Sequence, residues 1–312
     1  MAVDELRFSA MASDGQVIVV DGSPQACSSA QRALDQLEAC WSRFVDSSDV
    51  SRLNHGAGHP IRVDPATLTL IDVMVEAWEM TGGRYDPTIL AALLEAGYVA
   101  SIDDPAACTV LPAGHDTEAT RALSPADIET DHGRRSITLP IGMAVDPGAI
   151  GKGLAADLVV AELLARGASG VLISIGGDIA AAGEAPSRDG WEIEIEDPRD
   201  PLSTSARVRF SGGGVATSST RTRRWTRSGV ERHHTIDPAT GAPSDTDLAA
   251  VTVFAACGWM AEAHATAVLL GGIAGFDNYT GMNRIEAVAT TTTGETRTTT
   301  GLAGLVPTAV AP

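Results

Sequence analysis

The clearest hydrophobic pattern in the chain lies between residues 144 and 183. Apolar residues recur there at helical spacing, at Leu154, Leu158, Val159, Leu163 and Leu164. Gly167 follows where a left-handed C-terminal cap is expected, so the pattern predicts a helix that begins at Gly151 or Lys152. Residues 171–175 then form a short apolar run typical of a buried strand. The stretch predicts a turn, a helix, a strand and a second turn in succession.

The two turns of this stretch indicate a binding site for an anion. A helix N-terminus exposes unpaired N–H groups and partial positive charge, and Lys152 adds a full charge there. Polar and glycine residues surround this position at Gly151, Gly153, Gly176, Gly177 and Asp178. We expect the glycines to let a ligand approach the backbone closely.

Two phosphate-binding motifs resemble this stretch to different degrees. The Walker A pattern does not fit, because Asp146 replaces its first glycine and Gly153 follows Lys152 where Ser or Thr would hold magnesium. A dinucleotide-binding pattern fits better, since Gly151 and Gly153 open a helix and the acidic Asp178 follows the next strand. The spacing to Asp178 is longer than usual, and this alternative stays open at this point.

Periodicity elsewhere predicts a mixture of helices and strands. Helices are expected at 25–44, 65–81, 89–94 and 259–270, with a short helical segment after the polar residues 46–49. Strands are expected at 8–11, 16–20, 137–145, 191–195, 206–210 and 248–255, with turns at 12–15 and 197–201. Residues 99–135 lack sustained periodicity and are interpreted as a variable surface region. The threonine-rich end, 290–300, alternates like an edge strand before a tail that we expect to fray.

Charge and composition narrow the possible partners. The formal net charge of −18 argues against binding to nucleic acid or to an anionic membrane surface. No apolar run is long enough to span a membrane, and the first residues lack the profile of a signal peptide. We therefore expect a cytoplasmic protein, unless an export segment has been removed. The four cysteines are scattered and are interpreted as small buried residues.

A basic run, residues 221–227, stands out in this acidic chain because it holds four arginines around Trp225. Alternating Arg and Thr suits a solvent-facing strand, while contact with substrate phosphates or with an acidic partner is the alternative. His233 and His234 follow; on a strand they would point to opposite faces, so only one of them can face a site.

Two further groups of residues suggest chemistry. Arg84, Tyr85 and Asp86 are presented together in a turn before a proline, and N-capping explains only the aspartate. Glu262 and Thr266 stand four residues apart on one helix face, where their oxygens suit magnesium. An exposed Glu262 and a buried Thr266 would be the structural interpretation of the same pair.

Eight segments in order resemble the ApbE family, the FAD:protein FMN transferases. They are MAS at Met11, RFVDSSDVSRLN at Arg43, TGGRYDPT at Thr81, VDPGAIGKGLAAD at Val145, ISIGGDI at Ile173, VATSS at Val215, HTIDPATG at His234 and AEAHAT at Ala261. The resemblance implies an α+β fold related to the T-fold, with mixed layers of antiparallel sheet and helices around an FAD cleft. It also implies a single domain over 1–312, with two lobes and a terminal strand and tail at 287–312.

The resemblance further implies a reaction and its residues. With Mg²⁺, the family transfers FMN from FAD to a Ser or Thr hydroxyl of an acceptor protein and releases AMP. Flavin-nucleotide contacts fall on Met11, Phe44, Arg84, Tyr85, Asp86, Asp146, Lys152 and Ile236, and the matched segments add Gly176, Gly177, Asp178, Thr217 and Ser218. The metal positions fall on the Ala149 carbonyl, Glu262 and Thr266, while His234 or Asp237 is the candidate base.

Four positions depart from the family pattern. Glu262 stands in place of the usual aspartate, His264 in place of an apolar residue, Phe44 where tyrosine is common, and Ser219 in place of a glycine. The longer Glu262 side chain displaces the carboxylate by about one bond, which matters for the strict geometry of magnesium. A magnesium-dependent FAD pyrophosphatase and a non-catalytic FAD-binding protein are therefore kept as alternatives.

Overall fold

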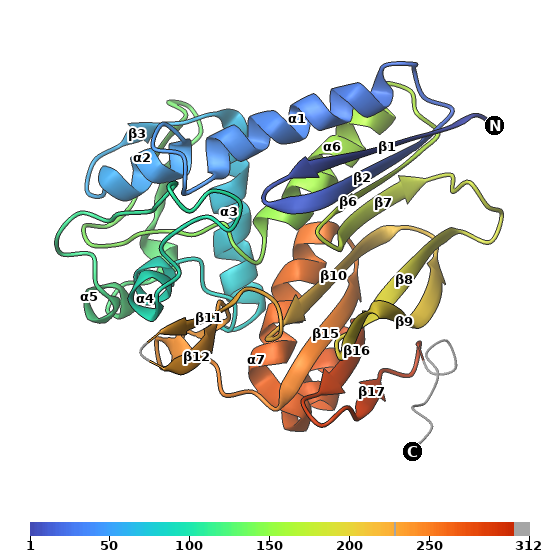
Figure 1. Cartoon of the computed structure of the whole chain (residues 1–312). Coiled ribbons are helices and arrows are strands. Elements are labelled where there is room, and N and C mark those ends of the chain that lie inside the picture. Colours follow the sequence, from blue (N-terminus) through green and yellow to red (C-terminus); the bar gives the residue numbers. More distant parts are fainter. Residues whose placement is uncertain (228, 303–312) are drawn as a thin grey trace. The chain divides into compact units, whose positions relative to one another are not determined.

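A computed structural model describes residues 1–227 and 229–302 of the chain (Figure 1). The chain forms two compact units: the first comprises residues 1–34, 152–222 and 245–312, and the second comprises residues 35–151 and 223–244. The part of the predicted tail at 303–312 lies outside the described residues. No helix in the described part is long and apolar enough to cross a membrane.

An eight-stranded antiparallel sheet forms the centre of the first unit, in the order β1-β2-β6-β7-β10-β15-β16-β17. Its strands are β1 (Val3–Ala10), β2 (Ser13–Val20), β6 (Gly170–Ile175), β7 (Asp178–Gly183), β10 (Gly213–Ser219), β15 (Leu248–Ala255), β16 (Glu286–Thr291) and β17 (Thr296–Thr298). The predicted edge strand at 290–300 is confirmed only in part: residues 290–291 end the inner strand β16, and the edge strand is β17, which follows β16 in this order.

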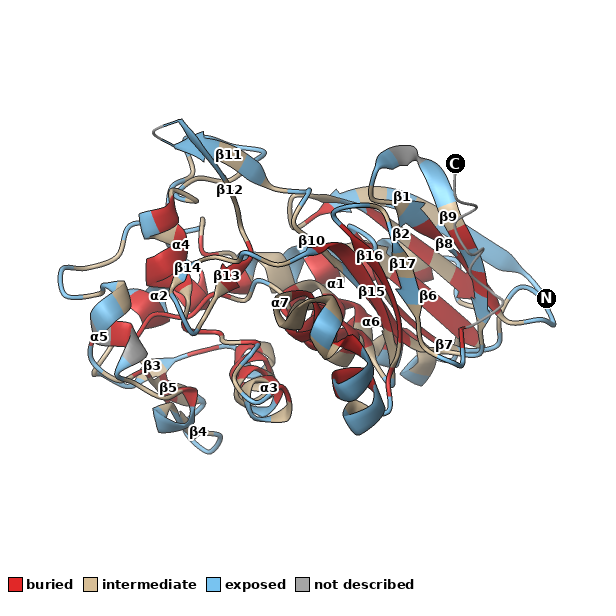
Figure 2. Cartoon of the chain, turned by 90° about the horizontal axis from the view of Figure 1, so that it is seen from below, coloured by how far each residue is buried: buried red, intermediate tan, exposed pale blue. Residues whose placement is uncertain are grey.

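Alternation along the strands places apolar clusters on both faces of this sheet, whose central strands are largely buried (Figure 2). In β16, Ala287 and Ala289 pack with helix α7 (Gly258–Asn283), whereas Val288 between them packs with the hairpin of β8 (Trp191–Asp197) and β9 (Asp200–Phe210). The sheet is therefore buried on one face by a helix and on the other by a β-hairpin. This hairpin confirms the predicted one around residues 197–201.

Helix α6 (Gly151–Ala165) begins where the sequence predicts, and its end has the predicted glycine cap. Gly167 has φ 97°, its N–H donates to Leu164 O, and Ala168 N–H donates to Leu163 O, which satisfies carbonyls that the helix leaves unpaired. Helix α7 is longer than predicted. Gly272 interrupts it with φ 64° and ψ 176° at the predicted stop, but a second helical segment continues directly to Asn283.

The second unit holds most of the shorter elements. They are the last turns of α1 (Ala26–Trp41), α2 (Asp49–His55), α3 (Pro65–Met80), α4 (Leu90–Ala96), α5 (Thr117–Arg121) and a 3₁₀ turn at Pro125–Asp127. Its strands are β3 (Ile61–Arg62), β4 (Glu129–Asp131), β5 (Ser136–Thr138), β11 (Arg224–Arg227), β12 (Val230–His233), β13 (Ile236–Asp237) and β14 (Ala242–Pro243). The mixture of helices and antiparallel sheets in the two units confirms the predicted α+β class.

Several sequence predictions are wrong in detail. None of the four cysteines is buried as predicted, since Cys108 is exposed and the other three are half-buried. The strand predicted at 137–145 is only β5, because Pro140 and Gly142, which has φ 86°, end it. The first hairpin turns at Met11 and Ala12, both with positive φ, instead of at 12–15. The dinucleotide-binding alternative is excluded, because β6 after α6 pairs antiparallel with both β2 and β7, whereas that fold needs parallel strands.

Candidate functional site

Lys152 lies among buried carboxylates in the first unit. Its ammonium group pairs with Asp178, and Glu262 Oε1 lies 3.3 Å from Lys152 Nζ. The two carboxylate side chains are 3% and 5% exposed, so these charges are screened little by water. The predicted cation at the start of α6 is thus held by two acids that come from β7 and α7. We call Lys152, Asp178 and Glu262 the lysine group.

Glu262 also joins the N-terminal ends of two helices. Its Oε2 accepts a hydrogen bond of 2.8 Å from Gly153 N–H, one of the orphan donors in the first turn of α6. A side chain at Gly153 would lie 2.5 Å from the backbone of Gly258. The close approach of α6 and α7 therefore requires this glycine, which the sequence interpretation had assigned to ligand approach.

Asp157 holds the beginning of α7 in place. Its carboxylate accepts the N–H groups of Gly258 and Trp259 at 2.8 and 2.9 Å, and the N-cap residue Cys257 makes no side-chain cap of its own. Burial raises the pKa of Asp157 to about 6, and the two backbone hydrogen bonds offset only part of that rise. Periodicity gave no sign of this contact, because Asp157 lies about a hundred residues from its partners.

Strand β10 brings two more predicted residues toward the lysine group. Asp178 Oδ1 accepts the Thr217 N–H at 3.3 Å, and Ser218 Oγ lies 3.1 Å from Thr266 Oγ1 of α7. Thr217 and Ser218 point to opposite faces of the sheet, and the Thr217 hydroxyl pairs with Thr252 at 2.8 Å. Only the hydroxyl of Ser218 therefore joins the face that carries Thr266.

Two tight turns lie beside each other at the same end of the sheet. Strands β1 and β2 turn at Met11, while β6 and β7 turn at Gly176 and Gly177, which have φ 59° and 89°. Gly176 N–H donates to Asp14 O at 2.8 Å, and a side chain at Gly176 would lie 2.8 Å from Ser13 Oγ. The two predicted glycines thus provide a two-residue turn with positive φ at both positions, which most residues adopt only at a cost.

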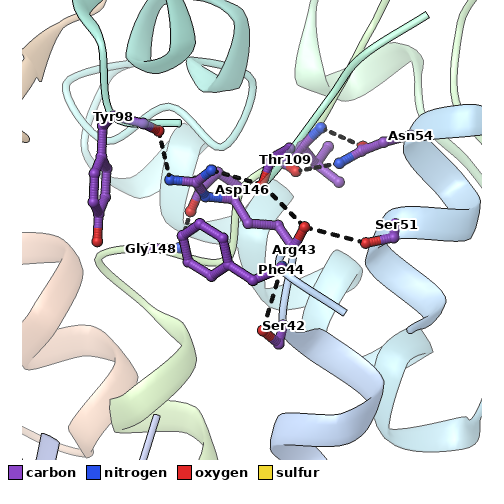
Figure 3. A network of polar contacts seen from close by, with 10 residues as sticks. Ser42, Arg43, Phe44, Ser51, Asn54, Tyr98, Thr109, Asp146 and Gly148 are labelled. Atoms are coloured by element: carbon purple, nitrogen blue, oxygen red, sulfur yellow. Dashed lines mark hydrogen bonds and ion pairs between the residues drawn. The ribbon is translucent and has the colours of Figure 1, made fainter. Parts of the chain in front are cut away.

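Arg43 is the corresponding buried cation of the second unit (Figure 3). Its Nε lies 2.9 Å from Asp146 Oδ2, and its two Nη atoms donate to Thr109 Oγ1 at 2.8 Å and to Tyr98 O at 3.1 Å. The guanidinium also lies 4.1 Å from the ring centre of Phe44 and 4.8 Å from that of Tyr98. It therefore fixes two predicted ligand contacts, Phe44 and Asp146, at once.

Trp225 stacks on Tyr98 and so adds a third ring to the two that lie beside the Arg43 guanidinium. Its ring lies 5.5 Å from that of Tyr98 with an angle of 18° between the planes, and its indole N–H donates to Ala96 O at 2.9 Å. Sequence reasoning assigned no role to Arg43 or Tyr98. The signal in the sequence was the adjacent Arg43 and Phe44 at the start of a matched segment. The packing of Tyr98 on Arg43, and of Trp225 on Tyr98, is shown only by the fold.

The Arg84–Asp86 turn is buried in part: Arg84 is exposed, Tyr85 is buried and Asp86 is half-buried. Tyr85 is 2% exposed, and its N–H is bound by Thr81 Oγ1 at 3.0 Å. Asp86 Oδ1 accepts both the N–H and the hydroxyl of Thr88, at 2.7 and 2.6 Å, and burial raises the pKa of this carboxyl above its ordinary value. Asp86 lines a cavity of about 250 Å³ together with Thr88, Thr117, Thr120, Pro238 and Gly241.

The Asp-Pro turn after β12 holds the candidate bases. Asp237 Oδ1 accepts Ala239 N–H at 2.9 Å, so its carboxylate also supports the turn. His234 is half-buried between β12 and β13. Ile236 is 2% exposed and packs in an apolar cluster with Ala92, Leu93 and Ala96, so its side chain belongs to the core of this unit.

The three predicted metal-binding residues, Glu262, Thr266 and Ala149, lie in different surroundings. Glu262 and Thr266 are buried or half-buried oxygen donors one helical turn apart, and the lysine group holds one more carboxylate than cations. That excess fits a hard cation such as Mg²⁺. Nearby His264 adds no charge at neutral pH, because burial lowers its pKa to about 4. Ala149 belongs to the second unit and has a left-handed backbone, with φ 63°.

Comparison with known proteins places these features in a family. The family model described as "ApbE family" matches residues 11–289. A FAD:protein FMN transferase of Treponema pallidum is 32% identical over 261 residues, which cover 77% of this chain and 69% of the relative. One of Vibrio cholerae is 30% identical over 248 residues, which cover 77% and 72%. The chain belongs to the ApbE family.

Solved structures agree with this assignment. The flavinyl transferase ApbE of Pseudomonas stutzeri, in its apo form, has a TM-score of 0.81 and 27% identity, with 99% of this chain and 98% of that chain covered. The ApbE protein of Thermotoga maritima has a TM-score of 0.84 with coverage of 98% and 100%, and at 22% identity it supports the fold alone. The family resemblance and the ApbE-like fold predicted from the sequence are thus confirmed, and the named relatives are enzymes.

Proposed function

We propose that this ApbE protein transfers FMN from FAD to a Ser or Thr hydroxyl of an acceptor protein in a Mg²⁺-dependent reaction that releases AMP. Membership of a family whose named members are FAD:protein FMN transferases supports FAD as the substrate. The observation that carries the proposal is the lysine group, because a half-buried ammonium at a helix N-terminus beside an excess of buried carboxylate suits a phosphate together with a metal ion.

The proposed reaction is one phosphoryl transfer. The acceptor oxygen forms a bond to the FMN phosphorus of FAD, the bond from that phosphorus to the bridging oxygen breaks, and AMP leaves with the bridging oxygen. The hydroxyl proton passes to a base, for which His234 or Asp237 is the candidate. Such reactions depend more on positioning and charge neutralisation than on covalent help from the enzyme.

Each group of residues has its own part in this proposal. Lys152 and the N-terminal N–H groups of α6 would neutralise phosphate charge. Glu262, Thr266 and the Ala149 carbonyl would hold Mg²⁺, which supplies charge stabilisation at the pyrophosphate when bound. Phe44, held by Arg43, would offer a ring face for stacking, and Asp146 and the Arg84–Asp86 turn would orient the nucleotide.

The test is incubation of the protein with FAD, MgCl₂ and a library of threonine-containing peptides, followed by mass spectrometry. A peptide that gains the mass of FMN less one water, with AMP released in equal amount, is the expected result. FMN and AMP without a modified peptide would instead indicate an FAD pyrophosphatase. Unchanged FAD would indicate a protein that binds FAD without catalysing a reaction. Arg134→Met, at an exposed arginine of the second unit, serves as a control variant that should keep full activity.

A further inference from the structure

The β11–β12 ribbon is the most basic segment of an acidic chain. Five of the 22 lysines and arginines lie between residues 221 and 232, beside a single glutamate, although the net charge of the chain is −18. The proposed chemistry of FAD uses none of them. We define the arginine ribbon as Arg223, Arg224, Arg227 and Arg232, which all belong to the second unit.

The fold holds this ribbon on helix α4. Trp225 donates to Ala96 O and stacks on Tyr98, while the Arg227 guanidinium donates to Glu95 O. These carbonyls belong to the last turn of α4, where the helix leaves acceptors unpaired and favours a cation. Trp225 and Arg227 therefore have a structural role, which explains part of the basic run.

The other arginines are not explained by contacts within the protein. Among residues 1–227 and 229–302, no carboxylate forms an ion pair with Arg223 or Arg232, and Arg232 Nε is buried without a hydrogen-bond partner. Arg224 pairs with Glu231 across the ribbon, but both side chains are exposed. An exposed ion pair contributes about 0–1 kcal/mol, so an external carboxylate can displace Glu231 at little cost.

The chain runs directly from β12 into the candidate base His234. The paired part of each strand has four residues, which span roughly 13 Å, the length of about four extended residues. A segment lying along the ribbon would thus keep its hydroxyl within a few residues of its acidic side chains. The acidic remainder of the chain repels long polyanions and anionic membranes, which favours a short acidic peptide as the partner.

We propose that the arginine ribbon is the docking surface for acidic side chains that flank the acceptor hydroxyl by about four residues or fewer. The inference rests on the proposed function, since it concerns the acceptor of the same reaction. It makes charge, rather than an apolar groove, the property by which this unit selects its protein substrate.

The test is an anisotropy titration of a labelled octapeptide with four Glu and two Thr residues against the FAD-loaded protein, at about 50 and 200 mM salt. We expect the Gln counterpart to bind roughly tenfold more weakly, and Arg224→Glu with Arg232→Glu to abolish the difference. Glu231→Gln should tighten binding by about two- to threefold, since it removes the internal competitor. Arg134→Glu, an exposed charge reversal elsewhere in the same unit, should change nothing.

FAD affinity, measured in parallel by flavin fluorescence, separates this inference from the proposed function. Equal binding of the two peptides, or equal loss in the ribbon and Arg134 variants, overturns the docking surface. Weaker FAD binding in the ribbon variants with unchanged peptide binding also overturns it and assigns the arginines to phosphate. Acidic-peptide selectivity without any FMN transfer would retain the docking surface and refute the transferase.

Discussion

Arg43 in the second unit is a buried cation and Lys152 in the first unit is a half-buried one, and the two meet different partners. Lys152 faces two carboxylates and holds them as a point charge. Arg43 faces one carboxylate, one hydroxyl and one carbonyl, and two aromatic rings lie within 4.8 Å of its guanidinium. The lysine group keeps an excess negative charge, whereas the single carboxylate paired with Arg43 balances its charge.

This difference indicates how each cation acts. An ammonium group has no fixed plane, so Lys152 can turn from a carboxylate to a phosphate when a metal ion takes its place. A guanidinium has fixed donor directions, and Arg43 already uses Nε and both Nη groups. We therefore interpret Lys152 as a residue that contacts substrate and Arg43 as one that positions Phe44 and Asp146.

The largest effect is expected from Lys152→Met. Removing the ammonium deletes the phosphate partner and leaves Asp178 and Glu262 facing each other without a counter-charge. We expect kcat/KM for FMN transfer to fall by about 10²–10³. Steady-state kinetics measure the loss, and thermal unfolding separates it from misfolding. A variant that stays folded and retains more than a tenth of the activity would contradict the contact role of Lys152.

The next largest effect is expected from Asp157→Asn, which should change how the free energy of unfolding depends on pH. Its pKa is raised to about 6 in the folded protein from an ordinary value of 3.8, so folding favours the protonated acid. The stabilisation that protonated Asp157 contributes is full below pH 4 and is lost as the pH rises through 6. The free energy of unfolding of the protein relative to Asp157→Asn should therefore fall by roughly 3 kcal/mol between pH 4 and 7.

Urea unfolding at several pH values measures this difference. Glu162→Gln on the same helix is the control, because Glu162 is an exposed partner of Arg166 and its removal should shift stability equally at each pH. A constant difference between Asp157→Asn and the unmodified protein from pH 4 to 7 would show that Asp157 titrates normally.

Local signals in the sequence predicted local structure well. The start of α6, its Gly167 cap, strand β15 and the break of α7 at Gly272 all follow from periodicity and glycine placement within a few residues, although the helical segment after Gly272 was missed. The position of Lys152 at the start of α6 was also predicted, because a helix N-terminus is a property of one short segment; that it binds an anion stays a prediction. The Arg84–Asp86 turn and the pair Glu262 and Thr266 were also proposed from the residues themselves, and the family resemblance supplied the other candidates.

Contacts between distant segments could not be predicted in the same way. Gly153 and Glu262 are 109 residues apart, and Asp157 and Gly258 are 101 apart. No periodicity links such positions, so Gly153 was assigned to the ligand when the approach of Gly258 already requires a glycine. Arg43 was missed for a similar reason, because its partners Tyr98, Thr109 and Asp146 lie on three separate segments.

Substitutions of Glu262 test whether the excess negative charge of the lysine group contributes to Mg²⁺ binding. Glu262→Gln keeps the length and an acceptor for Gly153 N–H but removes the charge, so Mg²⁺ affinity should weaken by about 10–100-fold. Isothermal titration with Mg²⁺ in the presence of FAD measures this without relying on turnover. Glu262→Asp keeps the charge and restores the residue that is usual in the family, so its Mg²⁺ affinity should be no weaker than that of the unmodified protein, although it shortens the reach to Gly153 N–H. Unchanged affinity in Glu262→Gln would exclude Glu262 as a ligand.

The smallest effect is expected from Arg43→Lys, which keeps the charge beside Asp146 but loses the planar fork. Lysine cannot bind Thr109, Tyr98 O and Asp146 together while lying flat between two rings, so stability should fall by about 2 kcal/mol. FAD affinity should weaken with it, because Phe44 loses its support, while kcat at saturating FAD should change less than twofold. Lys152→Arg provides the matched exchange in the other group. If Arg43→Lys lowered kcat as strongly as Lys152→Arg, Arg43 would be a substrate contact rather than a positioning residue.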